Sequence, residues 1–298
     1  MLSLHTNTAA LAAQNAINTN QASLATSQTR LSTGFRINSS QDDAAGLQIA
    51  TRLQAQTSGM AVAMQNTQNS ISMMQTADGA LSETTAILTR MKDLATQAAD
   101  GSSTAQDQTA MQAEFDTLTS QLSNIVSNTS FGGTNLLNST NGTFAAAGGV
   151  QFQIGDTSAQ SMTVDISTQV SAMSTALTAA SAEFTGALTA APTAAPTAGA
   201  ELTSAASANA AIGNLSTAID SVSTVRSALG ANENSLQHTY NNLSNVSTNT
   251  TAATGRIMDT NFATESSTMT SDQMLLQAGT AMLKQSNSIN SLVMTLLQ

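Results

Sequence analysis

The segment LHTNTAALAAQNAINTNQASLATSQTRL, residues 4–31, carries the pattern that decides the fold of this chain. Its large apolar residues follow one another in single file at steps of seven, six, seven and seven. A repeat close to seven is typical of the narrow seam of a coiled coil. Such a helix has little to bury inside a monomer, so we expect neighbouring molecules to cover its seam. The seam residues are Leu4, Leu11, Ile17, Leu24 and Leu31.

Long helices are favoured at both ends of the chain, because proline is absent from the first 191 residues and the last 102. Apolar residues also recur at helical spacing between Leu53 and Ala95 and between Ile212 and Val246. We therefore predict a mainly α fold, a long antiparallel bundle or coiled coil in which the N- and C-terminal helices pair. A second narrow seam near the C-terminus comprises Leu275, Met282, Ile289, Leu292 and Leu296.

Local signals indicate where these helices begin and end. Gly34 suits the left-handed position that follows a helix, so the first helix should end just before it. We interpret Ser40 and Asp43 as a capping box that starts a second helix near residue 41. Helical spacing then continues to about Ala99, and a shorter helix should follow after a turn.

The periodicity changes in the middle of the chain. Apolar residues alternate with polar ones at 150–154 and again at 162–166, which predicts a β-hairpin over about 150–166. Residues 169–208 are rich in Ala, Thr and Ser and contain both prolines. We expect this stretch to be a short variable surface region, either a loop or one small packed segment.

The composition argues against several classes of partner. A net charge of −10 with only eight Lys and Arg does not favour nucleic acid or an anionic membrane. Cysteine is absent, so disulfides and thiolate chemistry are excluded. No Lys or Arg precedes Arg30, so the N-terminus lacks the basic start of a secretory signal peptide. No apolar run reaches the length that spans a bilayer.

No group of residues indicates catalysis, a cofactor or a metal. His5 and His238 have no acidic residue at ligand spacing, so we interpret them as ordinary helix positions. Asp42 and Asp43 are adjacent carboxylates of a kind used in acid–base chemistry, but a capping role explains both without a substrate. We predict a protein that is not an enzyme.

Five short motifs resemble, in sequence and in order, those of the bacterial flagellin family. The resemblance covers roughly residues 1–135 and 214–298 and leaves the middle without a counterpart. The motifs are RLSTGFRINS (30–39), DDAAGLQIA (42–50), SFGG (130–133), FATE (262–265) and LQAGT (276–280).

This resemblance implies a subunit that polymerises into the helical flagellar filament used for motility. Residues 1–44 and 258–298 would form an inner core domain of paired terminal helices. Residues 45–168 and 209–257 would form an outer core rod with the hairpin, and 169–208 the variable region. A head-to-tail interface without a closing rotation gives an open helix, so the unburied seams agree with a polymer.

The resemblance also implies partners and a location. The subunit would leave the cell through the flagellar secretion channel, without a cleaved signal peptide, and reside outside it in the flagellum. Its partners would be many copies of itself, the hook–filament junction and filament cap proteins, and an export chaperone that masks the C-terminal helix. A host flagellin receptor is a further partner implied by the family.

Three residues, Arg90, Leu94 and Glu114, match positions that contact this receptor in other flagellins. The alternative is that Arg90 pairs with Asp93 and that Leu94 serves subunit packing. Two other functions stay open at this point: a hook–filament junction protein, which shares the helical ends, and an intracellular coiled-coil scaffold.

Overall fold

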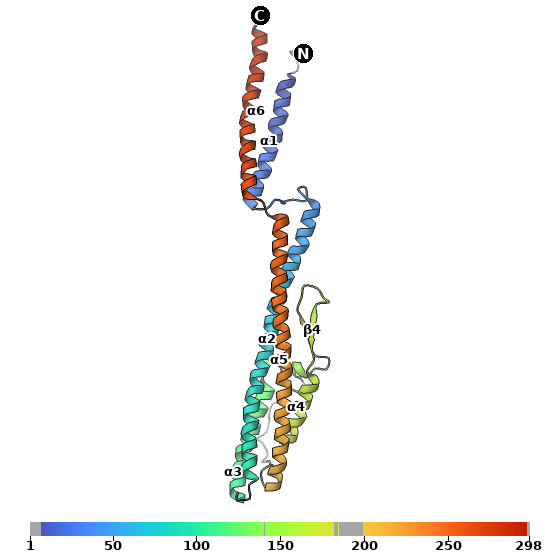
Figure 1. The fold of residues 1–298 in the computed structure, drawn as a ribbon, viewed down its shortest axis with the longest axis vertical. Coiled ribbons are helices and arrows are strands. Elements are labelled where there is room, and N and C mark those ends of the chain that lie inside the picture. The colour runs from blue at the N-terminus through green and yellow to red at the C-terminus, as the bar shows by residue number, and fades with distance from the viewer. Residues whose placement is uncertain (1–6, 140, 182–183, 185–198, 297–298) are drawn as a thin grey trace. The chain divides into compact units, whose positions relative to one another are not determined.

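The computed structural model describes residues 7–139, 141–181, 184 and 199–296 (Figure 1). The described part is mainly α-helical, as predicted. Its elements are α1 (Thr8–Thr33), α2 (Ala44–Ala98), α3 (Ala105–Asn128), β1 (Ser130–Phe131), β2 (Thr134–Asn135), η1 (Thr143–Ala145), β3 (Val150–Gln153), β4 (Ser161–Val164), α4 (Ser167–Ala180), α5 (Ala205–Met258) and α6 (Phe262–Leu296).

The chain divides into two compact units. A terminal unit comprises residues 1–57 and 247–298, and a central unit comprises residues 58–246. This division falls inside α2 and α5, whereas the domain boundaries expected at 44 and 258 coincide with the ends of these helices. The assignment of inner and outer core domains within a filament stays a prediction.

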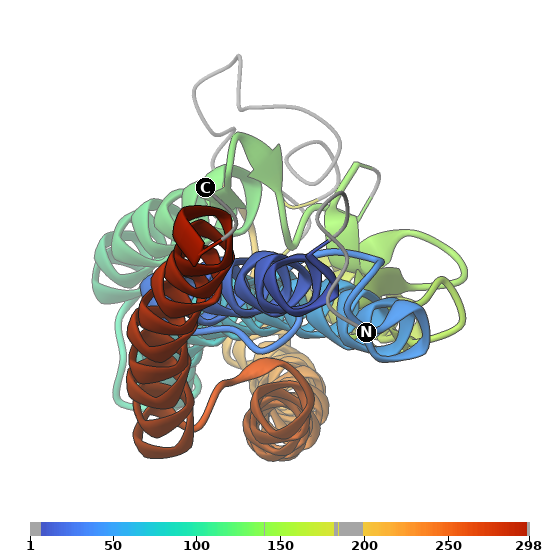
Figure 2. The ribbon, with the colours of Figure 1, turned by 90° about the horizontal axis from the view of Figure 1, so that it is seen from above.

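In the terminal unit, α1 and α6 lie side by side and run in opposite directions. Both views of the ribbon show this arrangement (Figures 1 and 2). The predicted pairing of the N- and C-terminal helices is therefore confirmed. Gly34 ends α1 with a φ of 76°, a left-handed value that glycine adopts without strain, and its N–H donates to the carbonyl of Arg30.

The predicted capping box at Ser40 and Asp43 is wrong. Helix α2 begins at Ala44 because Asp43 itself is the cap: its Oδ1 accepts from the backbone N–H of Gly46 at 2.8 Å. The neighbouring Asp42 accepts instead from the backbone N–H of Ser39 at 2.9 Å, from the Ser39 hydroxyl at 3.0 Å and from the backbone N–H of Asn38 at 3.1 Å. These bonds favour the carboxylate and lower the pKa of Asp42.

A capping box does occur at the start of α3. The Thr104 hydroxyl accepts from the N–H of Asp107 at 3.3 Å, and the Asp107 carboxylate accepts from the N–H of Thr104 at 3.0 Å. The same carboxylate also accepts from the Thr104 hydroxyl at 2.6 Å, and together these bonds lower the pKa of Asp107. They satisfy backbone donors that the first turn of a helix leaves without a partner.

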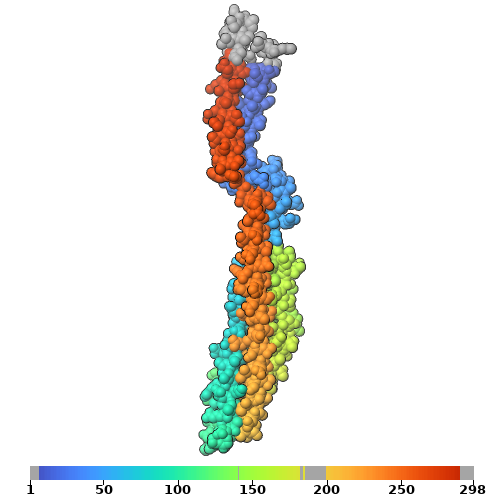
Figure 3. Space-filling model, in the orientation of Figure 1, coloured from blue at the N-terminus to red at the C-terminus, as the bar shows by residue number. Residues whose placement is uncertain are grey.

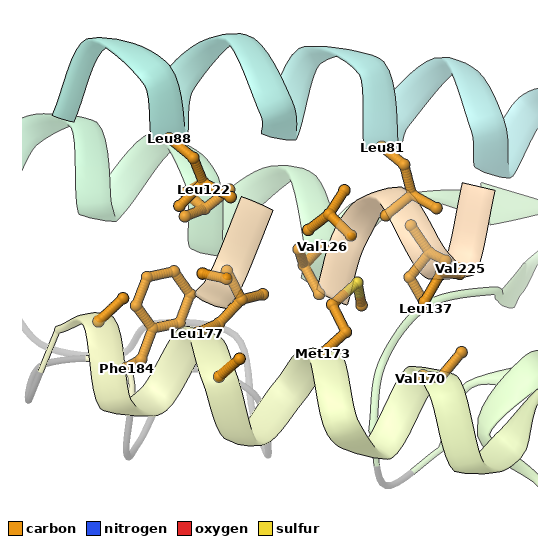
Figure 4. Close-up of a cluster of buried hydrophobic side chains, with 14 of the residues drawn as sticks. Leu81, Leu88, Leu122, Val126, Leu137, Val170, Met173, Leu177, Phe184 and Val225 are labelled. Atoms are coloured by element: carbon orange, nitrogen blue, oxygen red, sulfur yellow. The ribbon is translucent and has the colours of Figure 1, made fainter. Parts of the chain in front are cut away.

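The core of the central unit lies where α2, α3, α4 and α5 meet (Figure 4). Each helix presents apolar residues three or four positions apart, so a single face of each is buried. Full burial of one such side chain stabilises the fold by about 1.5–3 kcal/mol. Labelled members of this cluster are Leu81, Leu88, Leu122, Val126, Leu137, Val170, Met173, Leu177, Phe184 and Val225.

Of the loop and the small packed segment expected within residues 169–208, the described residues show a packed segment, helix α4. Residues 167–180 are helical, and Val170, Met173 and Leu177 are buried at steps of three and four. In the space-filling view, α4 and the neighbouring hairpin lie along α5 (Figure 3), and the side-chain amide of Asn214 donates to the Ala179 carbonyl at 2.8 Å. The two prolines lie outside the described residues.

The predicted hairpin is confirmed as the antiparallel pair β3 and β4, in which Val150 lies opposite Val164. A second, smaller hairpin pairs β1 with β2 and was not predicted. Its turn consists of Gly132 and Gly133, with φ values of 59° and 86°, as a two-residue turn with left-handed residues requires. Strands of two residues are too short to leave a periodic signal in the sequence.

Candidate assembly surface

The terminal unit has almost no apolar core of its own. Among the described residues, its buried hydrophobic side chains are Ile17, Ile37 and Ala50, while all the other buried hydrophobic residues belong to the central unit. A pair of long helices that buries so little gains little stability from its own packing. The candidate site of this unit is therefore the apolar surface that it leaves exposed to solvent.

One face of α1 packs against one face of α6 through small contacts. A methyl group placed on Gly279 would lie 2.9 Å from Cγ1 of Ile17, so the two helices approach each other closely at this point. Near the N-terminal end of α1, the side-chain amide of Asn7 donates to the Ser286 carbonyl at 3.3 Å. The Ser286 hydroxyl donates in return to Asn7 Oδ1 at 3.2 Å. These contacts fix the register of the pair.

A loose ion pair lies at the opposite end of the same face. Arg30 Nη1 and Glu265 Oε1 are 3.8 Å apart, beyond hydrogen-bond distance. Within the described part of the chain, Arg30 Nε, Glu265 Oε1 and Asp272 Oδ2 are buried without a hydrogen-bond partner. Charges that lose water without gaining hydrogen bonds add little or nothing to stability. The pairing of α1 with α6 is consequently only weakly stabilised by the monomer.

The two connectors of the terminal unit are joined by backbone hydrogen bonds. The N–H of Arg36 donates to the Met258 carbonyl at 2.6 Å, and the N–H of Thr260 donates to the Gly34 carbonyl at 2.9 Å. The Arg36 guanidinium also donates to the Ile257 carbonyl at 2.9 Å. These bonds hold the connector that follows α1 against the connector that precedes α6.

The outer faces of α1 and α6 expose large apolar side chains. Leu11 is 58% exposed, Met274 60%, Leu275 50% and Met282 66%. We refer to these four residues as the outer apolar residues. They are far more exposed than expected for side chains that cost free energy to hydrate. Phe35, Ile49 and Phe262 add further exposed apolar surface to the same unit.

The predicted N-terminal seam is split between two faces of α1. Ile17 is buried and Leu24 and Leu31 are half-buried on the side that α6 covers, whereas Leu11 is exposed. The step of six from Leu11 to Ile17 explains the split, because six residues at about 100° each leave the two side chains about 120° apart. Leu4 lies outside the described residues, so its place in the seam is untested.

The C-terminal seam is exposed where the structure describes it. Leu275 and Met282 lie on the outer side of α6, while Leu276, Gly279 and Leu283 are less exposed and alternate with them. The side chains of Ile289, Leu292 and Leu296 lie outside the described residues. Met274 and Phe262 were not predicted as surface contacts, although Met274 directly precedes the recognised Leu275.

The three receptor-like residues do not form one exposed patch. Arg90 Nη2 lies 2.7 Å from Glu114 Oε1, and the two side chains are 55% and 46% exposed. The alternative pairing of Arg90 with Asp93 is therefore wrong. Leu94 is only 2% exposed and packs into the core of the central unit, so the folded chain does not offer it to a partner.

The described residues contain no candidate metal centre. No three His, Cys, Asp or Glu side chains among them converge on a point where a metal ion could bind. An open groove of about 830 Å³ lies beside α4, and only Ala, Ser and Thr line it, including Ser171, Thr175 and Thr217. His238 is exposed on α5, and His5 lies outside the described residues. In this part of the chain, no helix combines the length and apolar character that crossing a bilayer requires.

Comparison with known proteins explains these exposed ends. Residues 4–142 match the bacterial flagellin N-terminal helical region, and residues 212–297 match the bacterial flagellin C-terminal helical region. The chain belongs to the bacterial flagellin family. It is a structural subunit of the flagellar filament, and flagellins are structural proteins rather than enzymes. The resemblance seen in the short motifs is thereby confirmed.

Full-length flagellins are similar to this chain. It is 33% identical to flagellin A of Vibrio anguillarum, and the alignment covers 100% of both chains. It is 37% identical to a flagellin of Halalkalibacterium halodurans over 95% of this chain and 94% of that one. A crystal structure of Bacillus cereus flagellin aligns with a TM-score of 0.47 and 28% identity, covering 60% of this chain and 88% of that chain.

Proposed function

We propose that the outer apolar residues Leu11, Met274, Leu275 and Met282 form the contact by which this flagellin packs against copies of itself in the filament. The observation that carries the proposal is the concentration of exposed apolar side chains on the unit that lacks a core. Covering one fully exposed Leu or Met releases about 1.5–3 kcal/mol. The four are 50–66% exposed in the monomer, so covering them contributes a part of the free energy that stacking requires.

The rest of the two predicted seams extends the same surface. Leu4 would continue the face of Leu11, since it lies seven residues before it. Ile289 and Leu296 would continue the face of Met282 at the same spacing, with Leu292 beside them. Ile17, Leu24 and Leu31 act differently in this proposal: they hold α1 against α6 and so present the outer face.

Seeded elongation tests this assembly surface. Purified monomer is warmed with short filament seeds, and long fibres are counted by electron microscopy. Met282→Glu places a charge where the proposal buries it, which costs about 3 kcal/mol or more. The critical concentration for elongation should therefore rise more than about a hundredfold.

The matched control is Gln273→Glu, which adds the same charge to the same helix. Gln273 is exposed about 180° around α6 from Met282 and about 100° from Met274, so it does not belong to the outer apolar residues. We expect this variant to elongate seeds far better than Met282→Glu. Equal elongation by wild type and Met282→Glu would refute the proposed surface, and failure of the wild type to elongate seeds would refute polymerisation through it.

We further propose that the apolar face of α6 binds an export chaperone before the subunit leaves the cell through the flagellar channel. An amphipathic helix with exposed anchors such as Met274 and Met282 suits a hydrophobic groove. Co-purification of a partner that survives deletion of residues 274–298 would contradict this assignment. In the same proposal the filament cap and the hook–filament junction proteins meet the terminal unit at the two ends of the polymer.

Recognition by a host flagellin receptor is proposed to use the Arg90–Glu114 pair. In this half-exposed ion pair, Nε and Nη2 of Arg90 both donate to Oε1 of Glu114, which gives a partner a specific feature to bind, whereas the buried Leu94 does not. Arg90→Asp should abolish stimulation of receptor-bearing cells by the monomer. Arg52→Asp, at another exposed position of α2, is the matched control. Unchanged stimulation by Arg90→Asp would remove this pair from the proposal.

A further inference from the structure

Two methionines of α6 differ from every other methionine whose side chain the structure describes. Met274 and Met282 are exposed, whereas the others are buried or half-buried. The difference is sharpest against the core of the central unit, where Met74, Met91 and Met173 are fully buried. Because the chain contains no cysteine, thioethers are its only sulfur groups.

Exposure decides how readily a thioether reacts with an oxidant. The sulfur lone pair attacks one oxygen of hydrogen peroxide, the O–O bond breaks, and a sulfur–oxygen bond forms while water leaves after proton transfer. Sulfur loses two electrons and the peroxide gains them, so the product is methionine sulfoxide. A buried methionine can follow the same path only when the packing around it opens.

We infer that Met274 and Met282 are oxidation sites, and that hydrogen peroxide acting on them stops the free subunit from joining a filament. The inference rests on the proposed assembly surface, to which both residues belong. A sulfoxide is polar and accepts hydrogen bonds, so it loses free energy when an apolar interface covers it without a donor. Each oxidised residue should weaken association about tenfold or more.

The position of Met274 and Met282 also makes the oxidation selective for free subunits. In a free subunit both sulfurs face solvent, but in the proposed polymer the neighbouring copies cover them. Oxidant would then act on unassembled subunits and spare finished filament. Methionine sulfoxide reductases of the two stereospecific classes reverse the product, so the block is removable.

The first experiment measures the sites directly. Wild-type monomer is treated with limiting hydrogen peroxide, and sulfoxide at each methionine is followed by peptide mass spectrometry. Met274 and Met282 should be oxidised at least about tenfold faster than Met74 and Met91. The same two residues in preformed filament should react much more slowly than in monomer.

The second experiment measures assembly. The critical concentration for elongation by oxidised monomer should rise about a hundredfold, and incubation with both reductases should restore it. The variant Met274→Leu/Met282→Leu conserves volume and apolar character, so it should elongate at a normal rate and keep that rate after peroxide. The matched control Met74→Leu/Met91→Leu should lose elongation as the wild type does.

Three results would overturn the inference: oxidation of the core methionines as fast as Met274 and Met282, normal elongation by fully oxidised monomer, or equal peroxide sensitivity in Met274→Leu/Met282→Leu. Circular dichroism checks that this variant is folded, and reductase rescue of the wild type tests the inference without any variant. Untreated monomer that fails to elongate seeds counts against the assembly surface, whereas the mass-spectrometric selectivity tests the oxidation sites independently.

Discussion

Glu233 of α5 is a carboxylate that the central unit accommodates poorly. Its Oε1 is buried without a hydrogen-bond partner in the described part of the chain. The adjacent charges are already matched, since Arg226 Nε lies 2.8 Å from Asp78 Oδ1 on α2. Burial and, second, the charge of Asp78 raise the pKa of Glu233. Replacing Glu233 by its neutral isostere should therefore stabilise the protein.

The structure limits the size of this effect. One carboxylate oxygen without a partner costs about 1–3 kcal/mol, and the partial exposure of Glu233 places the expected gain of Glu233→Gln near the lower end, about 1 kcal/mol. In a unit spanning residues 58–246, a gain of this size raises the melting temperature by about 2–4 °C.

The pH dependence of stability provides a second, independent test of the role of Glu233. The pKa of Glu233 is higher in the folded than in the unfolded protein, so folding takes up a proton as pH falls through the folded value. The wild type is thus destabilised at a pH above the folded-state pKa of Glu233, and this destabilisation disappears as the carboxylate becomes protonated at lower pH. The advantage of Glu233→Gln should be full at neutral pH and should vanish as pH approaches the ordinary glutamate value of 4.5.

Thermal unfolding followed by circular dichroism at several pH values measures both effects. Glu83→Gln is the matched control, because Glu83 is exposed on α2 and its replacement should leave the melting temperature unchanged. A Glu233→Gln variant that is less stable than wild type at neutral pH, or whose advantage does not shrink on acidification, would refute this account of Glu233.

Three further substitutions test the packing described above. Leu94→Ala should destabilise the central unit by about 2–5 kcal/mol because it empties a fully packed site, measured as a drop in melting temperature; an effect no larger than that of a surface substitution would contradict its burial. Gly279→Leu should force α1 and α6 apart at Ile17, at a cost of about 1–3 kcal/mol, and make both helices more sensitive to protease in the monomer. Unchanged cleavage would contradict their close approach. Thr104→Ala should cost about 0.5–2 kcal/mol and speed hydrogen exchange in the first turn of α3. Since the pKa of Asp107 is lowered by its bonds to Thr104, the part of the effect that comes from the carboxylate should fade as pH drops below about 3.8.

The long helices and the hairpin could be predicted because they depend on the periodic spacing of apolar residues. This spacing can be recognised even in a chain of unusual composition. Leu81 and Leu88 repeat at helical spacing whatever lies between them, and Val150 and Phe152 alternate as a half-buried strand requires. Helix α4 was missed although Val170 and Met173 have helical spacing, because Ala, Thr and Ser between them resemble a loop.

Other details could not be predicted from spacing alone. The start of α2 depends on which of two adjacent aspartates binds the free N–H groups, and Asp43 does so while Asp42 braces the preceding turn. Leu11 is exposed and Ile17 is buried because the step between them is six residues and not seven. The apolar spacing alone does not show which of the two faces α6 covers. The exposure of Leu11 depends on the packing of Ile17 against Gly279, which the spacing of the seam does not specify.

The outer apolar residues imply how the polymer responds to its surroundings. The subunit carries only 9% charged residues, so dissolved salt has few interactions to screen at the contacts that we propose for its Leu and Met side chains. Association driven by removing apolar surface from water weakens on cooling. Filaments of this flagellin should therefore tolerate both fresh and saline water, and low temperature rather than low ionic strength should loosen them.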